Sequence, residues 1–291
     1  MIIPLIILTS CGKHKNEWYL IKKIDDRTFI ISEPKSSQTN SSYLICGSNE
    51  AILFDSGTGE NKSESIIQIT RSLTKLPITL LLSHFHFDHI GNINDFKRIG
   101  MPEIQLLDNR ISIDSLINIT NSETLTKTTV TLKISKLFPV EKDIDLGNRK
   151  IKILPTPGHS KESISIIDSE NRLVFTGDLI YNGLLLLDDC NDYVESINEI
   201  LENSDSKYRV FGSHGKSEVN YKQLMQIKKA FEIYFADSSS IKPIGQINLF
   251  GSTKDIYKIG DVSFIDGYID IFNYDYNKNP QVKDLMRLLP S

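Results

Sequence analysis

The chain has little cysteine, no long apolar stretch after its first residues and no excess of basic charge. Its three cysteines, Cys11, Cys46 and Cys190, form no CxxC pair and give no disulfide framework. Because no run of about 18 apolar residues follows the N-terminus, no internal transmembrane helix is expected. A formal net charge of −4 gives no general attraction to phosphate backbones, which argues against a nucleic-acid partner.

Length and composition predict a globular chain with one large domain or two fused halves. Hydrophobic residues make up 40% of the sequence and charged residues 24%, which are ordinary proportions for a folded protein. At 291 residues the chain is long enough to bury a full core. No repeat of solenoid length is present.

Apolar runs separated by turn residues predict an α/β (α+β) fold in which strands followed by a helix occur twice, in residues 18–107 and 150–235. Strands are predicted at 18–24, 28–32, 42–45, 51–54, 78–82, 103–107, 150–154, 163–168, 172–175 and 208–211, with a final strand pair in 256–272. Helices are predicted at 61–76, 90–99, 191–201 and 221–235. Residues 109–148 are predicted to be a variable insert near the functional site, and residues 273–291 a polar tail.

The stretch at 83–91 contains three of the six histidines and one carboxylate within six residues: His84, His86, Asp88 and His89. Imidazole and carboxylate are ligands that zinc and similar metals prefer. The apolar run at 78–82 predicts a buried strand, so these groups follow the carboxyl end of a strand, where α/β proteins gather ligands. Burying such a cluster would be costly unless a cation held it.

Three further polar residues also follow predicted strands. His159 stands in a Pro-Gly-His turn, Asp178 in a Thr-Gly-Asp turn, and His214 directly after the strand at 208–211. Any one of them alone would most often be a turn residue or a hydrogen-bonded core histidine. Seven residues of metal-ligand type in equivalent places predict a metal site instead.

The order His84-x-His86-x-Asp88-His89, then His159, Asp178 and His214, resembles the metallo-β-lactamase superfamily. Asp55-Ser56-Gly57 also matches the Asp-x-Gly turn that precedes this motif in the family. The resemblance implies one hydrolase domain over residues 17–272. It also implies a four-layer αβ/βα sandwich of two similar halves, with the metal site along one edge between the sheets.

The resemblance also implies a role for each residue. One metal would be held by His84, His86 and His159, the second by Asp88, His89 and His214, and Asp178 would bridge both. The expected cofactor is zinc, two ions per chain, with iron or manganese as alternatives. Asp55 is expected either to hold a ligand imidazole by its other N–H or to be a plain turn aspartate.

Aspartate at position 178 resembles the glyoxalase II and lactonase-like branch, because the largest class of β-lactamases in the superfamily has cysteine there and another has serine. Residues 257–264 are typical of a strand and not of a basic helical domain that recognises glutathione, so glutathione thioesters are not favoured. Tyr181 lies at the offset where N-acyl-homoserine lactonases have a substrate-contacting tyrosine. It is a candidate oxyanion donor, and simple packing beside the site is the alternative.

The function implied is a dinuclear zinc-dependent hydrolase. A metal-bridging hydroxide would attack an ester, lactone, thioester or amide carbonyl of a small-molecule substrate. Asp88 is also a candidate to orient the hydroxide and to carry its proton to the leaving group. Two alternatives stay open: β-lactam hydrolysis on the same scaffold, and an iron dioxygenase similar to persulfide dioxygenases. Neither the substrate nor the oligomeric state follows from the sequence.

The N-terminus resembles a bacterial lipoprotein signal. An apolar segment at 1–8 is followed by small residues, by Cys11 and at once by polar residues. Unlike the usual signal, it has no Lys or Arg before the apolar segment. We expect residues 1–16 to be signal and linker, with a lipid on Cys11 holding the enzyme in the periplasm or at the cell surface. The alternative is a plain hydrophobic N-terminus on a cytoplasmic protein.

Overall fold

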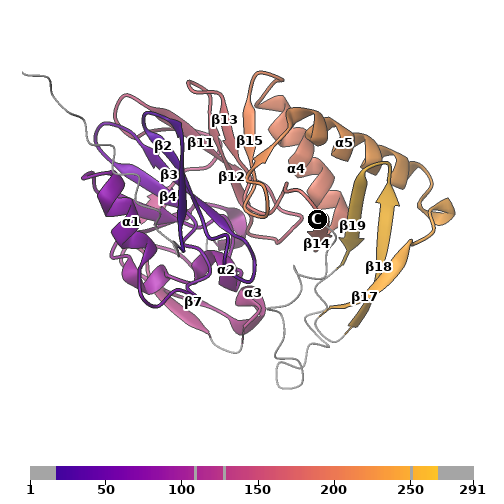
Figure 1. Cartoon of the computed structure of the whole chain (residues 1–291), viewed down its shortest axis with the longest axis horizontal. Helices are drawn as coiled ribbons and strands as arrows, with labels where there is room; N and C mark the ends of the chain where they lie inside the picture. The colour runs from indigo at the N-terminus through magenta and orange to yellow at the C-terminus, as the bar shows by residue number, and fades with distance from the viewer. Residues whose placement is uncertain (1–17, 108–109, 127–128, 250–251, 268–291) are drawn as a thin grey trace, which may run out of the picture.

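Two large sheets form the centre of the computed structural model, which describes residues 18–107, 110–126, 129–249 and 252–267 (Figure 1). The first sheet contains, in order, β1 (Leu20–Asp25), β2 (Thr28–Ser32), β3 (Ser41–Cys46), β4 (Ala51–Phe54), β5 (Ile78–Leu81), β6 (Ile99–Pro102) and β9 (Lys136–Phe138). The second contains β10 (Asp143–Asp145), β11 (Lys150–Pro155), β12 (Ile164–Asp168), β13 (Leu173–Phe175), β15 (Arg209–Phe211) and β16 (Glu218–Val219).

Each sheet begins as antiparallel strands and then changes to parallel pairing. Strands β1 to β4 pair antiparallel, whereas β4, β5, β6 and β9 pair parallel. Strands β10 to β13 pair antiparallel, and β13 pairs parallel with β15. Parallel neighbours need a crossover. Helix α1 (Ile66–Leu73) lies in the connection from β4 to β5, and α4 (Cys190–Glu202) in that from β13 to β15.

Alternating side chains of the second sheet enter two different cores. Ile166, Phe175 and Phe211 belong to the core shared with the first sheet. Their neighbours in sequence, such as Ile167 and Val174, pack with α4 and α5 (Tyr221–Ala236). Because successive strand residues point to opposite faces, the sheet is covered on both sides. With α1 on the outer side of the first sheet (Figure 1), the layers are helix, sheet, sheet, helix, as the sequence predicts.

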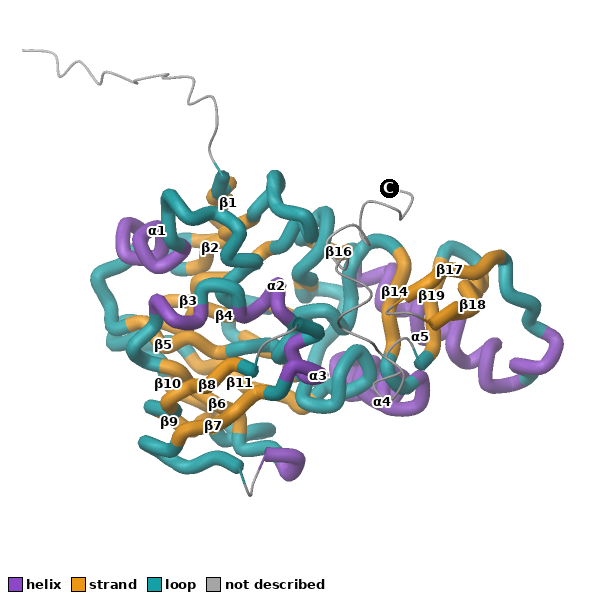
Figure 2. Tube along the Cα trace, turned by 90° about the horizontal axis from the view of Figure 1, so that it is seen from below, coloured by secondary structure: helices purple, strands orange, loops and turns teal. Residues whose placement is uncertain are grey.

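A third sheet extends the second half. It contains β14 (Leu184–Leu187), β19 (Val262–Asp266), β18 (Ser252–Ile259) and β17 (Gly245–Leu249), and it lies beside α5 at the end of the molecule away from α1 (Figure 2). The strand pair predicted in 256–272 corresponds to β18 and β19, which pair antiparallel. The sequence did not predict β14 and β17.

The insert also has regular structure. It contains the hairpin of β7 (Leu116–Ile119) and β8 (Val130–Lys133) and the short helix α3 (Asn121–Thr124). It also contains β9, which belongs to the first large sheet, and β10, which belongs to the second. The predicted signal and linker at 1–16 and the tail at 273–291 lie outside the described residues. Among the described residues, no helix is both long and apolar enough to cross a bilayer.

Two of the predicted elements are wrong. The helix predicted at 90–99 is replaced by α2 (Phe87–Ile90), a 3₁₀ turn at Ile93–Asp95 and the start of β6. The strand predicted at 103–107 lies earlier in the chain, at Ile99–Pro102, and is β6. Gly100 is in this strand, where the Phe138 ring packs closely: a Cβ on Gly100 would lie 2.3 Å from it. The helix predicted at 61–76 is shorter and begins after Ser65, whose side chain forms a capping box with Gln68.

A buried ion pair joins the two halves. Arg149 and Asp168 are fully buried, with Arg149 Nη2 at 2.5 Å and Nε at 2.7 Å from Asp168 Oδ2. The same guanidinium donates to the carbonyls of Arg27 and Cys46, each at 3.1 Å, and to Thr28 Oγ1 at 2.8 Å. Because the last three acceptors lie at the ends of β2 and β3, one side chain ties the second sheet to the first.

Replacing Asp168 with asparagine is expected to lower the free energy of unfolding by about 3–5 kcal/mol, because the Arg149 charge stays buried without its counter-charge. Urea unfolding followed by circular dichroism measures the change. Asp143→Asn is the matched control, since its ion pair with Lys150 at 3.6 Å is exposed and such pairs contribute little. Equal losses in both variants would contradict the assignment.

Candidate metal centre

The two halves bring all seven predicted ligand residues to one buried place. Each residue follows the carboxyl end of a strand: His84, His86, Asp88 and His89 follow β5, His159 follows β11, Asp178 follows β13, and His214 follows β15. All seven are at most 6% exposed. The approach of the halves is close, because a Cβ on Gly177 would lie 2.6 Å from Ser83 Cβ. The left-handed backbone of Gly177, with φ at +54°, also favours glycine there.

His84, His86 and His159 form the first donor set. His86 Nδ1 lies 2.8 Å from His84 Nε2 and 3.0 Å from His159 Nε2. Burial, reinforced by the neighbouring imidazoles, holds the pKa of His84 and His86 well below the ordinary value, and burial also lowers the pKa of His159. The three rings are therefore neutral, which is the form in which imidazole binds a metal.

Asp88, His89 and His214 form a second donor set, and Asp178 lies between the two sets. Asp88 Oδ2 is 3.6 Å from His89 Nε2 and 3.5 Å from His214 Nε2. Asp178 Oδ1 is 3.3 Å from His89 Nε2, and its Oδ2 is 2.8 Å from His214 Nε2. Burial alone would lower the pKa of His89 and His214, but the nearby carboxylates, led by Asp178, outweigh burial and raise it.

The outward ring nitrogens fix the tautomers. A carbonyl or a carboxylate only accepts hydrogen bonds, so an Nδ1 facing one carries a proton, and Nε2 is then the nitrogen that is directed inward and available to a metal. Three Nδ1–H groups donate in this way: His159 to Leu186 O at 2.8 Å, His214 to Gln38 O at 3.0 Å, and His89 to Asp55 Oδ2 at 2.8 Å. The Nε2 atoms of these rings therefore converge on the same interior.

Asp55 supports both donor sets through Ser83. Its carboxylate accepts from Ser83 N at 2.6 Å, from Ser83 Oγ at 2.8 Å and from His89 Nδ1. Since the Ser83 hydroxyl donates to Asp55, its oxygen accepts from His84 Nδ1 at 2.9 Å. Asp55 has a left-handed backbone, with φ at 69°. The expectation that Asp55 holds a histidine by its other N–H agrees with this geometry.

Several supporting residues were missed by the sequence reasoning. Asn40 Nδ2 donates to the carbonyl of Asp88 at 2.5 Å. Glu162 Oε1 accepts from Phe85 N at 3.1 Å, inside the histidine loop, and burial raises the pKa of Glu162 to about 7. Ser83 directly precedes His84, and that position was the available signal. Asn40 lies in a turn between β2 and β3 that carries no such signal.

The donor geometry fits metal ions. Each of three sets places its donor atoms within 4.8 Å of one another: His84, His86 and His159; His84, His89 and Asp178; Asp88, His89 and His214. His89 Nε2 and Asp178 Oδ1 are buried and have no hydrogen-bond partner. Unpaired buried polar atoms are costly. A cation at this place would satisfy both atoms and separate the converging lone pairs.

Tyr181 lies beside the centre, and its hydroxyl is engaged with β14. The hydroxyl donates to Leu184 O at 2.8 Å and accepts from Leu186 N at 3.1 Å. Its ring contacts His214 edge-on, with centroids 5.4 Å apart. Because the single hydroxyl proton is directed to Leu184, an oxyanion role would require this bond to open.

Comparisons with known proteins agree with this geometry. The family described as "Metallo-beta-lactamase superfamily" matches residues 38–217, a range that includes all seven ligand-type residues. An acyl-coenzyme A thioesterase of Homo sapiens is 25% identical over 213 residues, which cover 64% of this chain and 76% of the relative. A probable metallo-hydrolase of Bacillus subtilis is 28% identical over 142 residues, which cover 48% of this chain and 66% of the relative.

The solved structures show the same fold. A metallo-beta-lactamase from Pontibacter korlensis superposes with a TM-score of 0.57 at 15% identity, covering 74% of this chain and 99% of that chain. The family model matches more than half of the sequence, and the matched range contains every ligand turn. The chain therefore belongs to the metallo-beta-lactamase superfamily.

Proposed function

We propose that this chain is a dinuclear zinc hydrolase that cleaves thioesters. That it is a metal-dependent hydrolase follows from its superfamily and from relatives named as metallo-hydrolases and thioesterases. The two-metal assignment rests on one observation: two donor sets share a buried interior, and Asp178 lies between them. Its Oδ2 is 3.5 Å from His159 Nε2 of the first set, and its Oδ1 is 3.3 Å from His89 Nε2 of the second.

The residues divide by their place in the centre. His84, His86 and His159 would hold one ion, Asp88, His89 and His214 the other, and Asp178 both. Bound metal would supply Lewis acidity and a nucleophilic water at neutral pH. Imidazole and carboxylate donors suit zinc, and the absence of cysteine from the seven fits a catalytic rather than a structural zinc site.

The chain itself orients these groups and handles protons. Leu186 O, Gln38 O and Asp55 hold three imidazoles in the tautomer that directs Nε2 inward. Asp88 is fixed at its backbone by Asn40, so its carboxylate is placed at the interior edge, where it can take a proton from water and give it to a leaving group. When the C–S bond breaks, the leaving sulfur takes that proton to depart as a thiol, or it departs as a thiolate.

The thioester class is supported by the human relative, whose name is acyl-coenzyme A thioesterase. Aspartate at position 178 supports the same choice over β-lactams. Tyr181 is proposed to position His214 and β14, because its hydroxyl already bonds the backbone of that strand.

Replacing both His84 and His86 with alanine is expected to remove metal binding and hydrolysis together, because the first donor set then retains one imidazole. Elemental analysis of the purified protein and release of thiol from acyl-coenzyme A thioesters measure the two effects. Two zinc ions per wild-type chain are expected. Thioester hydrolysis that survives the double substitution would overturn the proposal.

The same assay panel separates the alternatives. Turnover of nitrocefin with no thioester hydrolysis would indicate a β-lactamase. A single iron per chain with oxygen consumption on a persulfide would indicate a dioxygenase.

Asp55→Asn is expected to weaken metal binding about 10- to 100-fold, because the amide supports the Nδ1–H of His89 and the Ser83 contacts less strongly than a carboxylate does. Competition with a chromophoric chelator measures the affinity. Asp95→Asn is a matched control, since Asp95 is an exposed aspartate bonded to Ser65 away from the centre. Unchanged affinity in Asp55→Asn would show that Asp55 is only a turn residue.

A further inference from the structure

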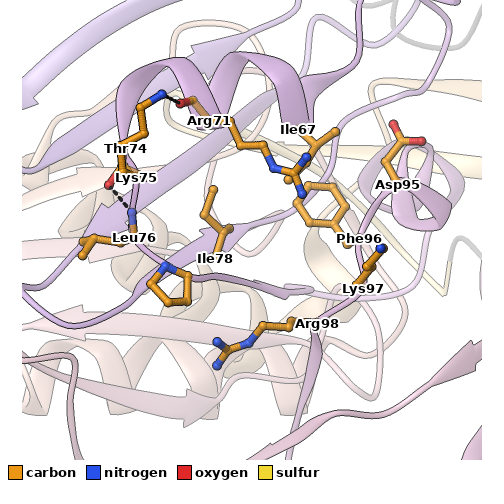
Figure 3. A pocket seen from close by; sticks show the side chains of 11 residues that line it. Ile67, Arg71, Thr74, Lys75, Leu76, Ile78, Asp95, Phe96, Lys97 and Arg98 are labelled. Atoms are coloured by element: carbon orange, nitrogen blue, oxygen red, sulfur yellow. Dashed lines mark hydrogen bonds between the residues drawn. The ribbon is translucent and has the colours of Figure 1, made fainter.

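A surface cavity of about 560 Å³ lies beside α1, at the end of the first sheet opposite the metal centre (Figure 3). Its walls are α1, the turn that leads into β5, and the segment before β6. Pro77 and Ile78, at the start of β5, line it, whereas His84 and the donor sets follow the other end of that strand. The cavity is therefore separate from the site already described.

Positive charge gathers around this cavity. Arg71 and Lys75 come from the α1 side, and Lys97 and Arg98 come from the opposite wall (Figure 3). All four are exposed, and Asp95 is the one carboxylate among the lining residues. Such a concentration is unusual for a chain with a formal net charge of −4.

These cations are poorly neutralised. Some cations on the described surface are neutralised by carboxylates, as in Arg209 with Glu218 and Lys133 with Asp114. Within the described residues, Arg71 and Lys97 have no ion-pair partner. Arg98 has a long contact of 3.4 Å with Glu50, and that carboxylate is shared with Lys136 at 2.6 Å. The field at the cavity mouth is therefore positive.

The floor between the cations is apolar. Ile67, Leu76, Ile78 and Phe96 line it, and Figure 3 shows Ile78 and Phe96 between Arg71 above and Arg98 below. A cationic rim around an apolar floor suits a surface that is anionic outside and hydrocarbon beneath. Anionic phospholipid has this arrangement, and basic side chains are attracted to its headgroups.

We propose that this face, formed by Arg71, Lys75, Lys97 and Arg98, docks on an anionic phospholipid membrane. The proposed lipid anchor would bring it there, because Cys11 precedes Trp18 by seven residues, a reach of about 25 Å at most. The first described strand, β1, lies on the same side of the molecule as α1 (Figure 2). Docking by this face leaves the metal centre, at the other end of β5, directed away from the lipid.

Vesicle flotation of the full chain carrying Cys11→Ser tests the electrostatic contribution of this face to membrane binding in the absence of the lipid anchor. The protein is expected to bind phosphatidylcholine vesicles that contain about a third phosphatidylglycerol, and not pure phosphatidylcholine. Each cation near an anionic surface changes the partition coefficient about fivefold. The double variant Arg71→Gln with Lys97→Gln is therefore expected to bind at least about tenfold more weakly, while its thioesterase activity and circular dichroism stay unchanged.

Lys222→Gln with Lys229→Gln is the control, because it removes two exposed charges from α5, away from the cavity. Equal loss in this control would overturn the proposal, since binding would then follow net charge alone. Binding that does not depend on anionic lipid would also overturn it. Loss of vesicle binding in millimolar inorganic phosphate at constant ionic strength would indicate a small-anion site and would likewise overturn it.

Discussion

The arrangement of the loops depends on one electrostatic constraint: several lone pairs and two carboxylates face the same buried interior. His84, His89 and Asp178 lie within a few ångströms of one another with almost no exposure. Hydrogen bonding does not remove the cost of that convergence, because His89 Nε2 and Asp178 Oδ1, which lie 3.3 Å apart, have no hydrogen-bond partner. A bound cation does remove it. The two sheets, the outward hydrogen bonds and the close contact at Gly177 can all be understood as means of holding these donors in place until a metal is bound.

Backbone carbonyls supply part of the support around this centre, in addition to the side chains of Asp55 and Ser83. Carbonyls of Leu186 and Gln38 accept from two imidazoles, and the carbonyl of Asp88 is held by Asn40. Such contacts depend on where strands end and not on which side chains they carry. Away from the centre, the Arg149 guanidinium performs a similar task, since it bonds acceptors from both halves of the molecule. Polar contacts therefore align the halves, whereas the apolar cores hold them together.

The seven residues predicted as donors lie together in the structure, whereas the local structure near them was predicted less well. Histidine spacing and the turns at Asp55, His159 and Asp178 are local features of the sequence. The ligand-type residues could therefore be predicted from the sequence motifs. The fold class followed from two successions of strands and a helix. The prediction of a helix at 90–99 was wrong because pairing with β5 and β9 decides the conformation of Ile99–Pro102. These partner strands are distant in sequence. For the same reason β14 and β17 were missed, and Asn40 gave no signal because its contact with Asp88 spans 48 residues.

Asp55 has a consequence for how the centre can change over evolution. Its one carboxylate receives His89 directly and, through the Ser83 hydroxyl, also orients His84, so it belongs to both halves of the donor arrangement. A substitution there cannot adjust one donor set and leave the other alone. Variation that tunes a single position must come from the acceptors that serve one ring each, Leu186 for His159 and Gln38 for His214. Those acceptors are backbone carbonyls, which no side-chain replacement removes, so the centre is far more constrained in its outer contacts than the loops that surround it.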